Sequence, residues 1–191
     1  KLLKKDDFQR FLKMSLSEIA RHLQETEYSK EITELSVKFS GVNLIEYALN
    51  RNLENTFAKI LGFALQQTKG QISLYLQRYD TANIKTILRG KFSNAPNESI
   101  SNELIACGEL SRAFLERVIS ESGNVAEAVE HFKNTAYYAV LKKFSGDLTK
   151  MEDELDKLYY SAALAGEKDL NEYITLEISV KNALNRLRAK R

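Results

Sequence analysis

Apolar residues recur at intervals of three and four along this chain, and that interval narrows the possible folds more than any other feature. It places side chains along one side of an α-helix, where they can be buried together. We expect a helix over residues 43–67, and the same interval returns within residues 110–119 and 170–187. Among 191 residues only one proline and eight glycines interrupt such patterns. The sequence therefore predicts an all-α fold.

Helix starts and stops are marked locally. Three pairs place a short oxygen-bearing side chain three residues before a carboxylate, so that the two side chains satisfy amides left unpaired in the first turn. The pairs are Ser15 with Glu18, Asn124 with Glu127, and Thr149 with Glu152. Glycines predict breaks, at Gly41, Gly70, Gly90, Gly108, Gly123, Gly146 and Gly166. The lone proline lies in residues 92–99, the most loop-like segment.

Charge and cysteine content exclude several classes of protein. The 28 basic and 26 acidic residues give a net charge of +2, which provides no overall attraction to nucleic acid. Cys107 is the single cysteine, so this chain cannot build a disulfide framework or a cysteine zinc cage by itself, and a reducing, cytoplasmic compartment fits. The longest stretches free of charge, 60–68 and 158–166, are about half as long as a membrane-spanning helix. No transmembrane segment is predicted.

The two halves of the chain resemble each other. Residues 83–91 (Asn-Ile-Lys-Thr-Ile-Leu-Arg-Gly-Lys) match residues 182–190 (Asn-Ala-Leu-Asn-Arg-Leu-Arg-Ala-Lys), and residues 18–28 match 127–137. A third match joins residues 45–49 to 151–155, in the same order along the chain. This order predicts a diverged duplication. We expect a first helical repeat domain over 1–93, a linker loop at 94–99 and a second repeat domain over 100–191.

Candidate chemical sites each have a simpler interpretation. Glu18 with His22 and Glu127 with His131 could contribute to a metal site, but both glutamates are already expected to cap helices. Cys107 with a histidine could act as nucleophile and base, although a lone cysteine is more often a small buried hydrophobe. No glycine-rich phosphate loop or hydrolase motif is present. No enzyme signature, metal site or cofactor is therefore predicted.

The last dozen residues are basic, which admits two interpretations. A basic tail can bind nucleic acid or a membrane surface. The charged residues are Lys181, Arg186, Arg188, Lys190 and Arg191. Arg188 and Lys190, however, match Arg89 and Lys91 in the first half, and cations favour the end of a helix. The repeat explains these residues better than a binding tail.

Residues 78–91, Arg-Tyr-Asp-Thr-Ala-Asn-Ile-Lys-Thr-Ile-Leu-Arg-Gly-Lys, resemble the C subunit of archaeal A-type ATP synthases and prokaryotic V-type ATPases, the relative of the eukaryotic d subunit. Further segments resemble the family in the same order. They are 18–19, 25–28, 39–41, 44–53 and 108–111. The second copy departs from the first, with Ala183, Leu184 and Asn185 in place of Ile84, Lys85 and Thr86. These differences argue against a binding role shared by the two copies, but not against a shared fold.

The resemblance implies three similar helical domains around a pseudo-threefold axis, forming a funnel. A third repeat would then follow Arg191, and part of a first helix would precede Lys1. It also implies a non-catalytic rotor subunit that joins the proteolipid ring to the central stalk on the cytoplasmic face of the membrane. Its partners would be the ring and stalk subunits, with no nucleic acid and no membrane span of its own. Such a subunit would contribute to proton or sodium transport coupled to ATP synthesis or hydrolysis.

The expected site is the family motif. We expect its residues to have a structural role, and the alternative is that they form a surface contact with a partner. Its residues are Tyr79, Asp80, Asn83, Lys85, Arg89 and Lys91, with Asn182, Arg188 and Lys190 in the second copy. Two other functions stay open from sequence. One is an α-helical protein–protein scaffold or adaptor unrelated to ATPases. The other is a helical enzyme that uses Cys107 or the Glu/His pairs.

Overall fold

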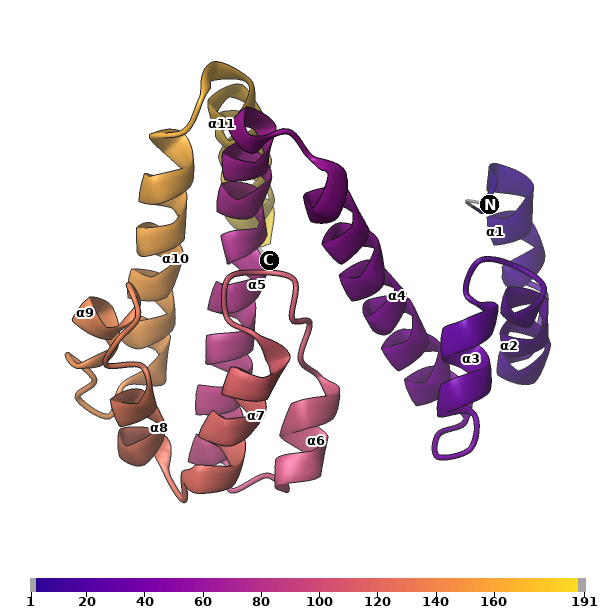
Figure 1. Ribbon diagram of the computed structural model, residues 1–191, viewed down its shortest axis with the longest axis horizontal. Coiled ribbons are helices and arrows are strands. Elements are labelled where there is room, and N and C mark those ends of the chain that lie inside the picture. Colours follow the sequence, from indigo (N-terminus) through magenta and orange to yellow (C-terminus); the bar gives the residue numbers. More distant parts are fainter. Residues whose placement is uncertain (1–2, 189–191) are drawn as a thin grey trace. The chain divides into compact units, whose positions relative to one another are not determined.

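The computed structural model describes residues 3–188, and within them it contains eleven α-helices and no strand (Figure 1). The expectation of an all-α fold is confirmed. The helices divide into two compact units, one of residues 1–60 and one of residues 61–191. This division differs from the repeat-based one at 94–99, because α5 packs closely with helices on the far side of that segment. The repeat domains stay a prediction.

The first unit is built from four helices. They are α1 (Lys5–Phe11), α2 (Leu16–Gln24), α3 (Ser29–Leu35) and most of α4 (Gly41–Phe63). Leu23, Ile32, Leu44 and Ala48 form its small buried core. The predicted cap at Ser15 is confirmed, since its hydroxyl accepts the amide of Glu18 while the Glu18 carboxylate accepts the amide of Ser15.

The second unit is organised around three long helices, α5 (Gln66–Phe92), α10 (Leu148–Leu164) and α11 (Lys168–Arg188). α10 packs against both α5 and α11 (Figure 1). The shorter helices are α6 (Asn97–Asn102), α7 (Arg112–Glu121), α8 (Val125–His131) and α9 (Tyr138–Leu141). Of these four, α6 and α8 pack on α5, α7 packs on α6 and α8, and α9 packs on α8 and α10. The large core lies here, and Ile84, Leu88, Leu115, Phe132 and Leu155 are buried in it.

Several predicted boundaries are wrong. The helix expected over 43–67 is two helices, because the chain turns at Leu65, whose backbone is extended, while the apolar spacing runs through the break. Gly70 and Gly90 lie inside α5 rather than at its ends. Gly90 has a packing role there, since a Cβ at this position would lie 2.4 Å from the Ile100 side chain. α6 begins at Asn97, inside the expected loop.

The third predicted cap is also wrong. α10 begins after Asp147, whose carboxylate accepts the amide of Lys150 at 3.1 Å, so Thr149 lies inside the helix. The nearby Gly146 has φ +95°, a conformation that favours glycine and that turns the chain into α10. Asn124, by contrast, caps α8 as predicted, with its side chain accepting the amide of Glu127 at 3.0 Å.

Candidate functional site

The family-like motif occupies the C-terminal half of α5 and has two sides. One side carries polar residues that are buried, among them Asp80, Asn83 and Lys91, with exposed fractions of 0%, 2% and 6%. The other side carries Lys85 and Arg89, which face α10. Buried polar groups are stable only when their hydrogen bonds are made inside the protein. The partners of each residue therefore decide its role.

Asp80 anchors the loop between α6 and α7. The amides of Glu109 and Leu110 donate to its two carboxylate oxygens at 2.8 and 3.0 Å, and the Tyr137 hydroxyl donates at 3.2 Å. Burial raises the pKa of Asp80, and these hydrogen bonds offset only part of that rise. Gly108 lies so close that a Cβ there would be 2.3 Å from the Asp80 carboxyl. Loop, helix and Tyr137 are thus joined through one buried carboxylate.

The raised pKa of Asp80 predicts a pH dependence of stability. Because its pKa in the folded protein lies above the ordinary value of 3.8, the folded state holds a proton that the unfolded chain releases. The contribution of Asp80 to stability therefore falls as pH rises from the pKa of Asp80 in the unfolded chain to its higher pKa in the folded protein. We expect the free energy of unfolding of the wild type, minus that of Asp80→Asn, to be larger at about pH 4 than at about pH 7. Urea titrations of both proteins at each pH measure it, and an equal or opposite difference would contradict the assignment.

Asn83 fixes a second point of the same loop. Its side-chain Nδ2 donates to the Ile105 carbonyl at 2.9 Å, and its Oδ1 accepts the Ile105 amide at 2.9 Å. A primary amide can satisfy both groups of one residue in this way because it carries a donor and an acceptor side by side. Asn83 is therefore buried and hydrogen-bonded within the second unit.

Lys91 caps the end of α7. Its ammonium donates to the carbonyls of Ile119 and Ser122 at 2.6 Å each and to the Asn97 side chain at 2.8 Å. Burial lowers the pKa of this ammonium. The last carbonyls of a helix have no partner inside the helix and attract a cation. Lys91 therefore joins the end of α5 to the end of α7.

Replacement of Lys91 by methionine is expected to lower the free energy of unfolding by about 2 to 3 kcal/mol, because buried carbonyls lose a charged donor while the length of the side chain is kept. Urea unfolding followed by circular dichroism measures the loss. Lys85→Met in the same helix is the matched control, and it should cost less than about 1 kcal/mol because its partner Asp156 is half exposed. Equal losses in the two variants would contradict the role of Lys91.

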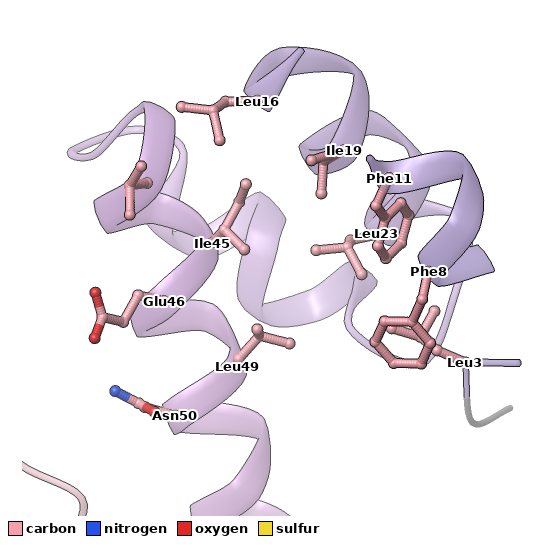
Figure 2. A pocket seen from close by; sticks show the side chains of 11 residues that line it. Leu3, Phe8, Phe11, Leu16, Ile19, Leu23, Ile45, Glu46, Leu49 and Asn50 are labelled. Carbon is pink, nitrogen blue, oxygen red and sulfur yellow. The ribbon is translucent and has the colours of Figure 1, made fainter. Parts of the chain in front are cut away.

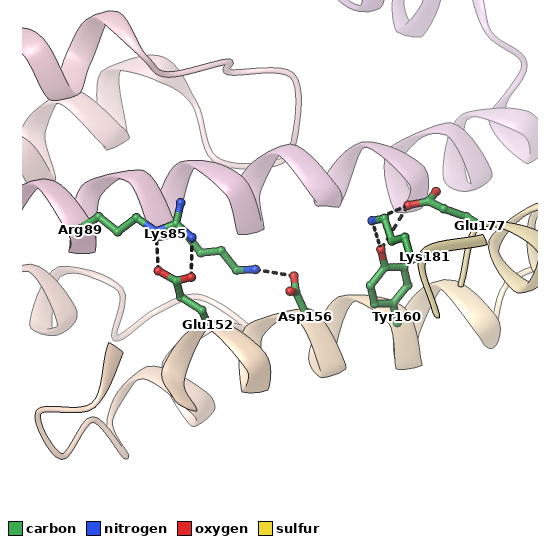
Figure 3. Close-up of polar contacts among 7 residues, drawn as sticks. All are labelled: Lys85, Arg89, Glu152, Asp156, Tyr160, Glu177 and Lys181. Carbon is green, nitrogen blue, oxygen red and sulfur yellow. Dashed lines mark hydrogen bonds and ion pairs between the residues drawn. The ribbon is translucent and has the colours of Figure 1, made fainter. Parts of the chain in front are cut away.

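The other side of α5 carries ion pairs to α10 and α11, and Figure 3 shows those to α10. Lys85 contacts Asp156 at 2.6 Å, and Arg89 binds both oxygens of Glu152, with 2.6 Å from its Nε. Further along, Glu177 of α11 accepts from Arg78 and Lys181 at 2.8 Å each. A planar contact through two parallel hydrogen bonds, such as Arg89–Glu152, fixes the geometry of the two side chains more closely than a single-point ion pair does. These pairs link α5 to α10 and α11.

Asp80, Asn83, Lys85, Arg89 and Lys91 of the first copy thus all have bonding partners inside the second unit. Tyr79 is half-buried, and burial raises its pKa. In the second copy, only two of the equivalent residues lie in the described part of the chain. Asn182 and Arg188 are exposed on α11, and Lys190 lies outside the described residues.

The glutamates of the two Glu/His pairs act at helix starts, whereas the histidines lie in the last turns of the same helices. Glu18 accepts cap hydrogen bonds from Ser15, and Glu127 accepts them from Gly123 and Asn124. His22 lies 3.6 Å from Asp7, and His131 lies 3.7 Å from Glu121. Within residues 3–188, no three His, Cys, Asp or Glu side chains gather in an arrangement that could hold a metal ion. Cys107 is buried.

Sequence reasoning missed two features of the first unit. Glu31 is buried and accepts from the side-chain amides of Asn55 at 2.8 Å and Asn52 at 3.3 Å, which hold its pKa below the ordinary value despite burial. The second feature is an open apolar groove of about 480 Å³ between α1, α2 and α4 (Figure 2). Apolar residues that recur on α4 beyond the buried Leu44 and Ala48 could have indicated it. The lining residues are Leu3, Phe8, Phe11, Leu16, Ile19, Leu23, Val42, Ile45, Glu46, Leu49 and Asn50.

Comparison with known proteins agrees with the motif. Residues 1–191 match the family model of the ATP synthase (C/AC39) subunit. The chain belongs to this family. Among curated proteins, the C subunit of the A-type ATP synthase of Methanosarcina mazei is 40% identical over 100% of this chain and 55% of its own length. That of Archaeoglobus fulgidus is 36% identical over 100% of this chain and 57% of its own length.

Membership of the C/AC39 family confirms the resemblance carried by residues 78–91 and by the shorter segments. The corresponding A-type ATP synthase protein of Haloferax volcanii, 34% identical over 97% of this chain and 57% of its own length, extends the likeness to a third archaeal genus. The chain spans a little over half the length of these C/AC39 relatives. No helix within residues 3–188 is both long and apolar enough to cross a membrane.

Proposed function

We propose that this chain is part of a non-catalytic rotor subunit of an A/V-type rotary ATPase. In this role it acts as a socket that joins the proteolipid ring in the membrane to the central stalk. The observation that carries the proposal is the C/AC39 family match over residues 1–191. Because the chain spans little more than half the length of its relatives, the role is proposed for a polypeptide of family length that contains it.

The packing of the second unit suits a mechanical connector. Torque passes through a connector only when its parts do not bend or slip, and close-packed helices resist both. Asp80 and Asn83 bind the loop between α6 and α7, and Lys91 binds the end of α7, so these contacts hold the covering segments on α5. Arg89 with Glu152 adds a two-point bond between α5 and α10.

The role requires two protein interfaces and no reaction centre. The proposed partners are the proteolipid ring and the central-stalk subunits, at the cytoplasmic face of the membrane. Rotation driven by protons or sodium ions through the ring would then reach the ATP-forming head, or run in reverse during hydrolysis. No residue of this chain is assigned a catalytic, metal-binding or cofactor-binding part in that process.

A binding experiment tests the proposal. The polypeptide, extended by its own reading frame to the length of its relatives, is tagged and incubated with detergent-solubilised proteolipid ring and with purified central-stalk subunits. A complex that holds all three is expected, with an unrelated helical protein of the same charge as the control. Failure to bind either partner would overturn the socket role and favour an adaptor with other partners.

A further inference from the structure

A small polar pocket is lined by residues of the three long helices of the second unit. It has a volume of about 220 Å³, which is ample for a few water molecules or a small ion. Arg78 and Lys85 of α5 and Lys181 of α11 bring three cationic side chains to it. Its other lining residues are Thr81, Ala82, Asp156, Tyr159 and Tyr160. Arginine, lysine and hydroxyl donors gathered around one pocket are the groups that recognise oxyanions.

Positive charge is in excess around this pocket. Glu177 accepts from Arg78 and from Lys181 at 2.8 Å each. Asp156 contacts the Lys85 ammonium at 2.6 Å (Figure 3). Three cations therefore face two carboxylates, which leaves one positive charge uncompensated among these five side chains. Because opposite charges attract more strongly where water is partly excluded, the pocket favours a further anion.

Hydrogen-bond donors also remain once these ion pairs are made. Arg78 donates to Glu177 through Nη2, whereas a guanidinium carries five N–H groups in all. Thr81 is 3% exposed, and its hydroxyl oxygen has no hydrogen-bond partner within residues 3–188. Buried hydroxyls without a partner are rare, because their lost hydration is not repaid. Threonine has two accessible χ1 rotamers in a helix, so this hydroxyl can turn toward a ligand without breaking a hydrogen bond.

Asp156 is the member of the cluster that can give way. Its side chain is 48% exposed, whereas that of Lys85 is 14% exposed. A half-exposed carboxylate exchanges an ion pair for water at little cost. The less exposed Lys85 ammonium would then be left in the pocket without a counter-charge. Asp156 therefore holds a position beside Lys85 that an external anion can take.

We propose that this pocket binds a small oxyanion of the phosphate class. The anion replaces the Asp156 carboxylate beside Lys85 and accepts from the other two cations and from Thr81. Glu177 stays in place, since its ion pairs hold those two cations at the pocket. The bound anion contacts side chains of both α5 and α11, so it strengthens the joint between these helices. The site does not depend on the rotor role.

Phosphorus NMR of inorganic phosphate titrated with the 191-residue chain measures the Kd directly. The titration is run near neutral pH in a buffer free of other oxyanions, with sodium chloride holding the ionic strength constant. Lys85→Met and Asp156→Asn break the same ion pair from its two sides. Lys150→Met is the charge-matched control for Lys85→Met, because the Lys150 side chain is 81% exposed and contacts Asp147. Circular dichroism checks that each variant is folded.

The expected result is that the two partners of one ion pair shift the Kd in opposite directions. Asp156→Asn should bind phosphate about tenfold more tightly than the wild type, because the competing carboxylate is gone, and Lys85→Met about tenfold more weakly. Lys150→Met should keep the wild-type Kd. Thermal unfolding gives a second readout, since a ligand of the folded state raises the Tm in the same rank order.

Several outcomes would overturn the phosphate site. One is an unchanged Kd in either Lys85→Met or Asp156→Asn, and another is weaker binding in both, since the ion pair would then be needed to shape the pocket. A loss in Lys150→Met equal to that in Lys85→Met would show a general effect of charge. Absence of binding to both the wild type and Asp156→Asn would do the same.

Discussion

Replacement of Asp80 by alanine is expected to lower the free energy of unfolding by about 3 to 5 kcal/mol, among the largest losses available to a single substitution in this chain. The change removes one acceptor group and leaves the amides of Glu109 and Leu110 and the Tyr137 hydroxyl without their partner. Buried donors without acceptors carry the full cost of lost hydration. Urea unfolding followed by circular dichroism measures the loss.

Asp80→Asn is the matched comparison, because it keeps the size of the side chain and one acceptor oxygen. We expect Asp80→Asn to lower the free energy of unfolding less than Asp80→Ala does, although the NH2 group of the new side chain would face a backbone N–H of the loop. Asp156→Ala is the surface control, because the Asp156 side chain is half exposed and its ion pair with Lys85 is expected to contribute little. A loss in Asp80→Ala no larger than in Asp156→Ala would show that Asp80 does not anchor the loop.

Gly108→Ala is the second substitution with a large expected effect. Its Cβ would lie 2.3 Å from the Asp80 carboxyl, closer than two such atoms approach in folded proteins. The loop must then move away from α5 and lose the hydrogen bonds to Asp80. We expect a loss of about 3 kcal/mol or more in the free energy of unfolding. Gly70→Ala, at an open helical position on α5, is the control and should be neutral or stabilising.

A double-mutant cycle separates the clash from a general effect on the loop. With Asp80→Ala already present, the carboxyl that Gly108→Ala would meet is absent. The cost of the second substitution should therefore fall, and the double variant should lose less stability than the two single variants added together. Additive losses would mean that Gly108 is required for a reason other than contact with Asp80.

Local sequence signals predict much of the helical architecture. They fail where the outcome depends on residues that are distant in sequence or on a turn that the apolar spacing does not mark. Ser15 and Asn124 are recognisable as caps because a cap depends on residues three positions away. The break at Leu65 escapes prediction because the apolar residues keep their helical spacing across the point where α4 ends and α5 begins. Gly90 has the residue type of a break, but its missing side chain makes room for Ile100, which comes ten residues later.

The candidate site is predictable as a set of residues, not as an arrangement. Family resemblance selects Asp80, Asn83 and Lys91, and nothing in their spacing distinguishes a buried clamp from a surface contact. Their partners lie in other segments, Asn83 with Ile105 and Asp80 with Tyr137. Which side of α5 faces α10 and which faces the loop depends on how those segments pack.

The sequence by itself determined the helical class, two caps, the internal match and the family, because each depends on residue type, short spacing or similarity along the chain. The tertiary structure alone decided which polar residues of the motif are buried and why the second copy differs from the first. The physical reason is that a side chain is buried only when another segment covers it. α6, α8 and α10 cover the motif on α5, whereas the equivalent surface on α11 is exposed.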